Sequence, residues 1–283
     1  MLNDGYAYTL RVQRGGDTVL ELLAREFRHS APEVWAARLL ADEVELDGVV
    51  VRGPEPLWPG QTLVWHRPPW PEEAVPLHFA VLHEDADLLA VNKPSGLPTM
   101  PGGGFLKHTL LSLVRQRWPG ASPLHRLGRG TSGAVLFSLN AAAGARVLEA
   151  WRTGGVRKTY RALASGVAQA DTADIRTPIG KVAHPRLGDI YAATPDGKPS
   201  HSIARVLERR AESTLFAVEI PTGRPHQIRI HLASIGHPLL GDRLYANPEA
   251  LAAHERLCLH ESMLSFTHPV SGERLKFECP APF

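Results

Sequence analysis

The chain has 283 residues, of which 43 % are hydrophobic, and its formal net charge is +2. This length suits two domains with a sizeable core, and the two cysteines, Cys258 and Cys279, are too few for a disulfide framework. The longest uncharged stretch, 130–145, contains Thr, Ser and Asn, which excludes a membrane span, and no targeting segment opens the chain. We expect a cytoplasmic protein.

Residues 1–66 are expected to form a small helical module closed by a sheet. Thr18–Glu21 and Ser30–Glu33 both have the pattern of a capping box, and each precedes apolar residues at helical spacing. Asp47–Gly48 lies between two short β-type runs and predicts a hairpin, and a last strand is expected over 63–65.

The order helix, helix, hairpin resembles an S4-like RNA-binding module. A purely structural appendage is the alternative, because residues 1–70 are acidic on balance. RNA contact would have to come from one local face, for which the candidates are Arg25, Arg28 and Arg38.

Prolines crowd the segment 67–76 and predict a stiff linker, because they fix φ and remove backbone donors. The second domain, 77–283, is mildly basic on balance, which suits a polyanion. Thr109 is positioned to cap a helix there. Strands are expected over 88–91, 134–137, 160–163, 203–206 and 214–220. These elements do not alternate regularly, so we predict an α+β fold with a mixed or antiparallel sheet.

Four segments of this domain concentrate polar side chains at turns beside apolar strands, namely 91–98, 125–133, 157–162 and 222–231. The second places two arginines on a glycine-rich turn, where forked guanidinium donors suit phosphates or base edges. A solvated or salt-bridged surface is the alternative. A metal site at His226 and His231 is not expected, because their spacing suits no single helix face.

These segments, in this order, resemble the RluA-type pseudouridine synthases, with further matches at 241–245, 259–266 and 277–280. The resemblance implies a pseudouridine-synthase-like domain that isomerises uridines in ribosomal or transfer RNA without a cofactor or metal. It also implies RNA as the partner, no membrane contact and action as a monomer.

One position departs from the family pattern His-Arg-Leu-Asp-Arg, because Gly128 stands where the family has its essential aspartate. Glycine can serve neither as a nucleophile nor as a base. Asp85, Asp87 and Asp242 are possible surrogates, although each also suits a turn or cap.

The other family positions are present. Tyr160 matches the tyrosine that stacks on the target base, although a core tyrosine on a strand would give the same pattern. Arg229 matches the partner of the missing aspartate and would be unpaired unless water, phosphate or another carboxylate replaces it. The implied RNA-binding residues are His125, Arg126, Arg129, Lys158, Arg224, His226 and Gln227.

Two functions therefore remain open from the sequence. The first is an RluA-type synthase with a displaced catalytic group, and the second is a non-catalytic RNA-binding protein of the same fold. A third reading is that Gly128 is an introduced substitution that traps RNA. All of them require Arg126, Tyr160 and Arg229 to meet in one crevice.

Overall fold

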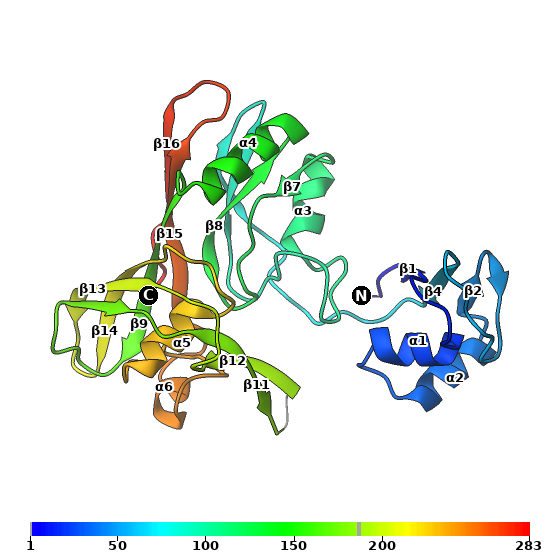
Figure 1. The fold of residues 1–283 in the computed structure, drawn as a ribbon. Coiled ribbons are helices and arrows are strands. Elements are labelled where there is room, and N and C mark those ends of the chain that lie inside the picture. Colours follow the sequence, from blue (N-terminus) through cyan, green and yellow to red (C-terminus); the bar gives the residue numbers. More distant parts are fainter. Residues whose placement is uncertain (1, 186–187) are drawn as a thin grey trace. The chain divides into compact units, whose positions relative to one another are not determined.

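The computed structural model describes residues 2–185 and 188–283, and the chain divides into two compact units, Met1–Glu72 and Glu73–Phe283 (Figure 1). No helix among the described residues has both the length and the apolar character to cross a membrane. The division falls inside the proline-rich segment 67–76.

The first unit packs two helices against an antiparallel sheet with the strand order β1-β4-β2-β3. Trp35 and Trp65 are fully buried at its centre and meet edge to face, with ring centroids 4.7 Å apart. Its elements are β1 (Tyr6–Arg11), α1 (Val19–Glu26), α2 (Pro32–Leu40), β2 (Val44–Leu46), β3 (Val49–Val50) and β4 (Thr62–Arg67).

One of the two predicted capping boxes is confirmed. The Thr18 side chain accepts from the Glu21 amide, and the Glu21 carboxylate accepts from the Thr18 amide. The box at Ser30 is wrong, because α2 begins at Pro32 with Ala31 as its cap. Proline favours the first helical position and so moves the start by one residue.

The predicted hairpin is confirmed, since Asp47 and Gly48 take φ values of 51° and 82° between β2 and β3. Strand β4 continues to Arg67, which the sequence placed in the linker. Strand β1, which pairs with β4, was not predicted.

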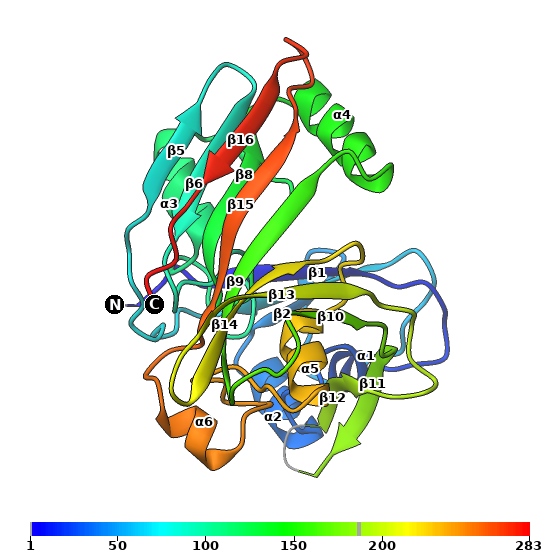
Figure 2. The ribbon, with the colours of Figure 1, turned by 90° about the vertical axis from the view of Figure 1, so that its left-hand side faces the viewer.

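The second unit is built on one mixed sheet with the strand order β10-β13-β14-β9-β15-β8-β6-β5, and the described pairs are antiparallel except for β8 with β15 (Figure 2). The predicted α+β class is thus confirmed. Its elements are β5 (Ala80–Glu84), β6 (Leu88–Lys93), α3 (Leu110–Arg117), β7 (Ser122–Pro123), β8 (Ser132–Ser138), α4 (Ala141–Arg152), β9 (Arg157–Ser165), β10 (Thr172–Ile175), β11 (Ile179–His184), β12 (Gly188–Ala193), β13 (Ser202–Arg209), β14 (Ser213–Glu219), α5 (Gln227–Ser234), α6 (Pro248–Ala252), β15 (Leu259–Thr267) and β16 (Arg274–Glu278).

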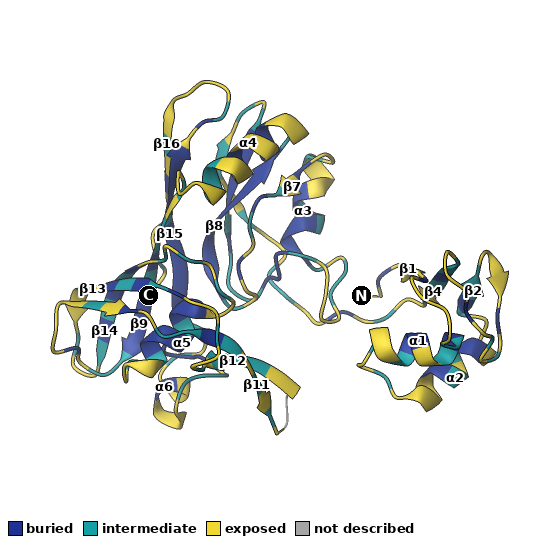
Figure 3. Cartoon of the chain, viewed as in Figure 1, coloured by how far each residue is buried: buried dark blue, intermediate teal, exposed yellow. Residues whose placement is uncertain are grey.

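Each strand predicted for this unit is present, and Thr109 caps α3 by accepting from the Ser112 amide at 3.2 Å. The central strands are covered on both faces, as the burial colours of β8 and β15 show (Figure 3). In β6, Leu89 and Val91 join one apolar cluster while Leu88 and Ala90 join another. A strand buried on both faces requires such a continuous apolar run.

Candidate functional site

A cavity of about 340 Å³ lies between the loop 126–131, strand β9 and helix α5. Its lining brings together most of the site residues expected from the sequence, namely Arg126, Gly128, Arg129, Tyr160, Arg224, His226, Gln227 and Arg229. His125 and Lys158 do not line it. Segments about one hundred residues apart in the chain thus form one crevice.

Lys93 at the end of β6 and Thr99 a few residues after it hold the loop 126–131. Lys93 is completely buried, and its ammonium donates to three main-chain carbonyls, one of which is that of Arg129. The Thr99 hydroxyl donates to the Leu127 carbonyl at 2.8 Å and accepts from the Leu127 amide at 3.2 Å. The loop is therefore fixed without a side chain at position 128.

Gly128 leaves open space on the cavity wall. A Cβ atom built there has one close neighbour, the Thr131 Oγ1 at 3.8 Å, which is ordinary van der Waals contact. Its φ also lies outside the left-handed region that favours glycine. The backbone would therefore accept a side chain at this position.

Arg229, on α5, is held by a fork-to-fork ion pair. Its Nε donates to Oδ2 of Asp242 at 2.8 Å and its Nη2 to Oδ1 at 2.6 Å, and Asp242 is only 1 % exposed. The amides of Leu244 and Tyr245 also donate to this carboxylate. Burial on its own would raise the pKa of Asp242, but Arg229 and these amides hold it below its usual value.

The cation at Arg229 therefore has a partner, supplied by a carboxylate other than one at position 128. Both Asp242 oxygens are engaged, which leaves this residue little capacity to act as a nucleophile or base. Its structural position agrees with the turn-type alternative considered for it.

Tyr160 contacts a second carboxylate, which sequence reasoning missed. Glu261 of β15 faces Tyr160 in the register of β9 and β15, and the Tyr160 hydroxyl donates to Glu261 Oε2 at 2.6 Å. Glu261 is 0 % exposed. The available signal was the single acidic residue of the strand-like run 259–266.

His125 and Lys158 lie against Trp151 of α4. The His125 ring centroid is 4.9 Å from that of Trp151, and Lys158 Nζ is 4.9 Å from the same ring. The Leu136 amide donates to His125 Nε2 at 3.1 Å, and burial, followed by the Lys158 charge, lowers the pKa of His125 to about 3. Direct contact of His125 with RNA stays a prediction.

The arginines of the cavity differ in how far they are free to bind a ligand. Arg126 is exposed and makes no ion pair or hydrogen bond with the described part of the chain. Arg129 forms a bidentate pair with Glu73, with Nη1 to Oε2 at 2.8 Å, and Arg224 donates to the Pro199 carbonyl at 3.0 Å. Arg126 is thus the most available of the three.

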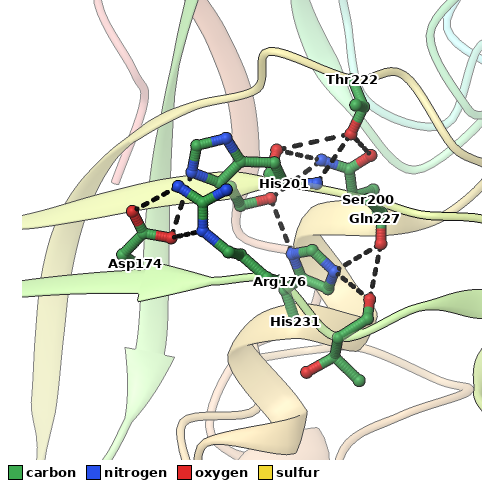
Figure 4. A network of polar contacts seen from close by, with 9 residues as sticks. Asp174, Arg176, Ser200, His201, Thr222, Gln227 and His231 are labelled. Carbon is green, nitrogen blue, oxygen red and sulfur yellow. Dashed lines mark hydrogen bonds and ion pairs between the residues drawn. The ribbon is translucent and has the colours of Figure 1, made fainter. Parts of the chain in front are cut away.

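Helix α5 is anchored by a polar network beside it, shown in Figure 4. The Gln227 amide donates to the His201 carbonyl at 2.7 Å, and the Thr222 hydroxyl donates to Gln227 Oε1 at 2.8 Å. His231, fully buried, contacts the Thr177 carbonyl through Nε2 at 2.9 Å. Gln227 and His231 thereby fix the helix that carries Arg229.

A second cavity of about 520 Å³ shares Arg129, Gly130 and Arg229 with the first. It adds two arginines and two carboxylates, namely Arg243, Arg256, Asp242 and Glu255. The Arg256 guanidinium donates to the Ser132 hydroxyl at 2.6 Å and forms no ion pair with a carboxylate of the described residues. This cationic extension was not predicted, and such guanidinium clusters suit phosphate groups.

Asp85 and Asp87 are too far from Gly128 to replace an aspartate there. Asp85 and Asp87 precede Leu88, which pairs with Ser138 at the far end of β8. Gly128 precedes the other end of β8, where Gly133 pairs with Lys93. Five residues of strand separate the two ends by about 17 Å. Asp85 instead accepts from the amides of Asp87 and Leu88 in a turn.

Asp85, Asp87 and His268 have ligand atoms close enough to hold a metal ion. The tautomer of His268 argues against this use. The amides of Val270 and Ser271 donate to its Nδ1, so the ring proton lies on Nε2, which faces Asp85 at 3.3 Å. A protonated ring nitrogen has no lone pair for a metal.

Known proteins are similar to this chain over most of its length. The family model described as RNA pseudouridylate synthase matches residues 87–234. An uncharacterized RNA pseudouridine synthase of Synechocystis is 42 % identical over 93 % of this chain and 94 % of its own length. The dual-specificity RNA pseudouridine synthase RluA of Pasteurella multocida is 35 % identical over 73 % of this chain and 94 % of its own.

Among solved structures, human RNA pseudouridylate synthase domain containing 1 is similar to this chain with a TM-score of 0.63 and 27 % identity, over 75 % of this chain and 87 % of that one. The sequence, the fold and the cavity therefore agree with one another. The chain belongs to the RNA pseudouridylate synthase family.

Proposed function

We propose that this protein isomerises uridine to pseudouridine in RNA, in the RluA manner, at the cavity between the loop 126–131 and α5. The observation that carries the proposal is the meeting of Arg126, Tyr160 and Arg229 on one cavity wall. Its volume of about 340 Å³ lies in the range of about 300–1,000 Å³ that is typical of ligand sites.

Each wall residue has a task in binding an everted nucleotide. The Tyr160 ring offers an aromatic face to a base, as base-flipping enzymes require. Arg126 is exposed and makes no ion pair or hydrogen bond with the described residues. Its side chain is therefore free to bind a phosphate or to fill the gap left in the RNA by the everted base. Arg229 is a rigid cation because Asp242 fixes it at two atoms.

The second candidate is a non-catalytic RNA-binding protein of the same fold. Gly128 favours it, because no carboxylate projects from this position and Asp242 is engaged by Arg229. Such a protein would bind RNA in the same cavity and leave the glycosidic bond intact.

The experiment that separates the two uses ribosomal and transfer RNA transcripts labelled with tritium at uracil C5. Isomerisation moves the ribose to C5 and releases the tritium to water, whereas binding alone releases none. We expect tritium release and a C5-linked nucleoside in the digested RNA. Tight binding without release supports the second candidate.

We also propose that the first unit is an S4-like RNA-binding module. Arg25 is paired with Asp17 and Glu26, and Arg38 lies over the Trp35 ring at 4.3 Å. Arg28 makes no ion pair with the described residues, so Arg28→Ala in the full chain should weaken RNA binding. Unchanged affinity would favour a structural role for this unit.

We propose a monomer that works in the cytoplasm on ribosomal or transfer RNA. The two cysteines, Cys258 and Cys279, are buried and free, which fits a reducing compartment. Light scattering of the protein with and without RNA tests the monomer.

A further inference from the structure

The hydroxyl of Tyr160 connects the cavity wall to a carboxylate that does not line the cavity. It donates to Glu261 Oε2 at 2.6 Å, and the other oxygen, Oε1, is buried without a hydrogen-bond partner among the described residues. Leaving a buried polar group unsatisfied costs about 1–3 kcal/mol. An unsatisfied carboxylate beside a site residue therefore needs an explanation.

The hydrogen positions around Glu261 follow from the neighbouring bonds. The Leu136 amide donates to His125 Nε2, so the proton of the neutral ring lies on Nδ1, 3.9 Å from Glu261 Oε2. That separation is too long for a hydrogen bond. The Tyr160 hydroxyl is thus the hydrogen-bond donor to this carboxylate within the part of the chain described.

The groups that face Glu261 are Lys158 and Tyr160 from β9, His125 from the segment before β8, and Cys279 after β16. Burial raises the pKa of Glu261 to about 7, although Lys158 and the Tyr160 hydrogen bond act against it. His125 stays neutral with a pKa of about 3, and burial raises that of Cys279 to about 11. With this pKa, Glu261 exchanges its proton near neutral pH.

We propose that Glu261 is the proton acceptor for Tyr160 during uridine isomerisation. This inference rests on the function proposed above and deepens it. Glu261 reaches the substrate only through the Tyr160 hydroxyl, so it is a positioning residue, and Tyr160 is the residue that touches the base. The pair does not depend on a side chain at position 128.

The step balances without an external reactant. The C1′–N1 bond breaks and a C1′–C5 bond forms, which leaves C5 tetrahedral with its hydrogen still attached. The Tyr160 oxygen takes this proton as its own proton passes to Glu261 Oε2. The C–H electron pair restores the C5–C6 double bond, the electrons of N1–C6 return to N1, and N1 takes a proton from water or back along the same route.

The test compares wild type with Glu261→Gln on C5-labelled RNA. Glutamine keeps the shape and accepts from Tyr160 through its amide oxygen, but it cannot take a proton. We expect the wild-type rate to rise with pH around 7, and the variant to lose that rise together with about 10²–10⁴-fold in kcat. KM should change little, because Glu261 does not line the cavity.

Three controls separate this role from a structural one. Glu278 is an exposed carboxylate on β16, and Glu278→Gln should leave the pH profile unchanged. Glu261→Asp should restore part of the rate. Deuterium at uracil C5 should slow Glu261→Gln more than wild type, because removal of the C5 proton becomes limiting. Burial lowers the pKa of Lys93 to about 7. Lys93 is present in wild type and in every variant, so its contribution to the pH profile cancels in the comparison.

Infrared spectroscopy reads the same pair without turnover. We expect a carboxylic acid band that disappears between pH 6 and 8. The band should be absent in Glu261→Gln and shifted in Tyr160→Phe. If wild type is active and Glu261→Gln keeps its rate and pH profile, the inference is overturned while the proposed function stands. If wild type binds RNA and releases no tritium, the proposed function fails, and the catalytic role fails with it whatever the band does.

Discussion

Arg229 and Asp242 form a buried bidentate ion pair, with Nε–Oδ2 and Nη2–Oδ1 distances of 2.8 and 2.6 Å. Both residues line the cavity of about 520 Å³, and the pair joins α5 to the turn formed by Asp242, Leu244 and Tyr245. It lets the site keep a cation in a sheltered place without a carboxylate at position 128.

Asp242→Asn should destabilise the second unit. Removing one partner of a buried ion pair typically costs about 3–5 kcal/mol, because the other charge is left unpaired. Hydrogen exchange of the α5 amides in rising urea measures the loss. Asp171→Asn removes a carboxylate from the exposed pair with Arg209 and should cost at most about 1 kcal/mol. Equal effects of the two variants would contradict the role given to the buried pair.

Gly128→Asp should fold normally and raise uridine isomerisation. The Cβ position is open, with Thr131 Oγ1 at 3.8 Å, and the new carboxylate would project from the wall that Tyr160 and Arg229 share. Tritium release from C5-labelled RNA measures the gain. Gly128→Asn, which has the same size and no charge, is the matched control, and a gain in both variants would show that the carboxylate is not the cause.

Arg126→Ala should weaken RNA binding and reduce the salt slope of the affinity by about one unit. Arg126 is exposed on the cavity wall, so the substitution breaks no ion pair or hydrogen bond with the described residues. Affinity at several salt concentrations gives the slope. Arg152→Ala, on α4, serves as the control, and an unaltered slope in Arg126→Ala would exclude a phosphate contact.

The contribution of Glu261 to the stability of the second unit should fall as the pH rises from about 4.5 to about 7. The folded-state pKa of Glu261 is raised from 4.5 to about 7, so the folded chain keeps a proton there that the unfolded chain has lost. Its contribution is complete below 4.5 and disappears through 7.

Thermal melts of wild type and Glu261→Gln across this pH range check that expectation. The variant should gain stability relative to wild type as the pH rises. The histidines His125, His226 and His260, whose folded-state pKa values are lowered from 6.5, act in the opposite sense up to about pH 6.5. They are common to both proteins, so the difference in Tm between the two proteins reports Glu261. A difference in Tm that does not vary with pH would place the ionisation of Glu261 elsewhere.

Local features of the fold were predictable because neighbouring residues determine them. The Thr18 cap, the Asp47–Gly48 hairpin and the Thr109 cap depend on residues three or fewer positions apart. Strand β1 was not predicted, because it is an edge strand whose residues are exposed or half-buried. Such a strand shows little alternation of hydrophobic residues. The cap predicted at Ser30 is absent because proline favours the first position of a helix, so α2 begins at Pro32.

The site was predictable in its residue types and only in part in its partners. Gly-rich turns with arginine and histidine indicated the segments that line the cavity, and the family resemblance supplied the roles. The contact of Tyr160 with Glu261 depends on the register of β9 against β15, which no local pattern determines. The parallel pairing of β8 with β15 is equally distant in sequence.

The buried ammonium of Lys93 makes the loop beneath the cavity responsive to alkali. With its pKa lowered to about 7 by burial, this side chain has three hydrogens for three carbonyls on the acid side and only two on the alkaline side. One carbonyl must then lose its donor. The protonation of one solvent-inaccessible side chain therefore sets how firmly the loop 126–131 is held.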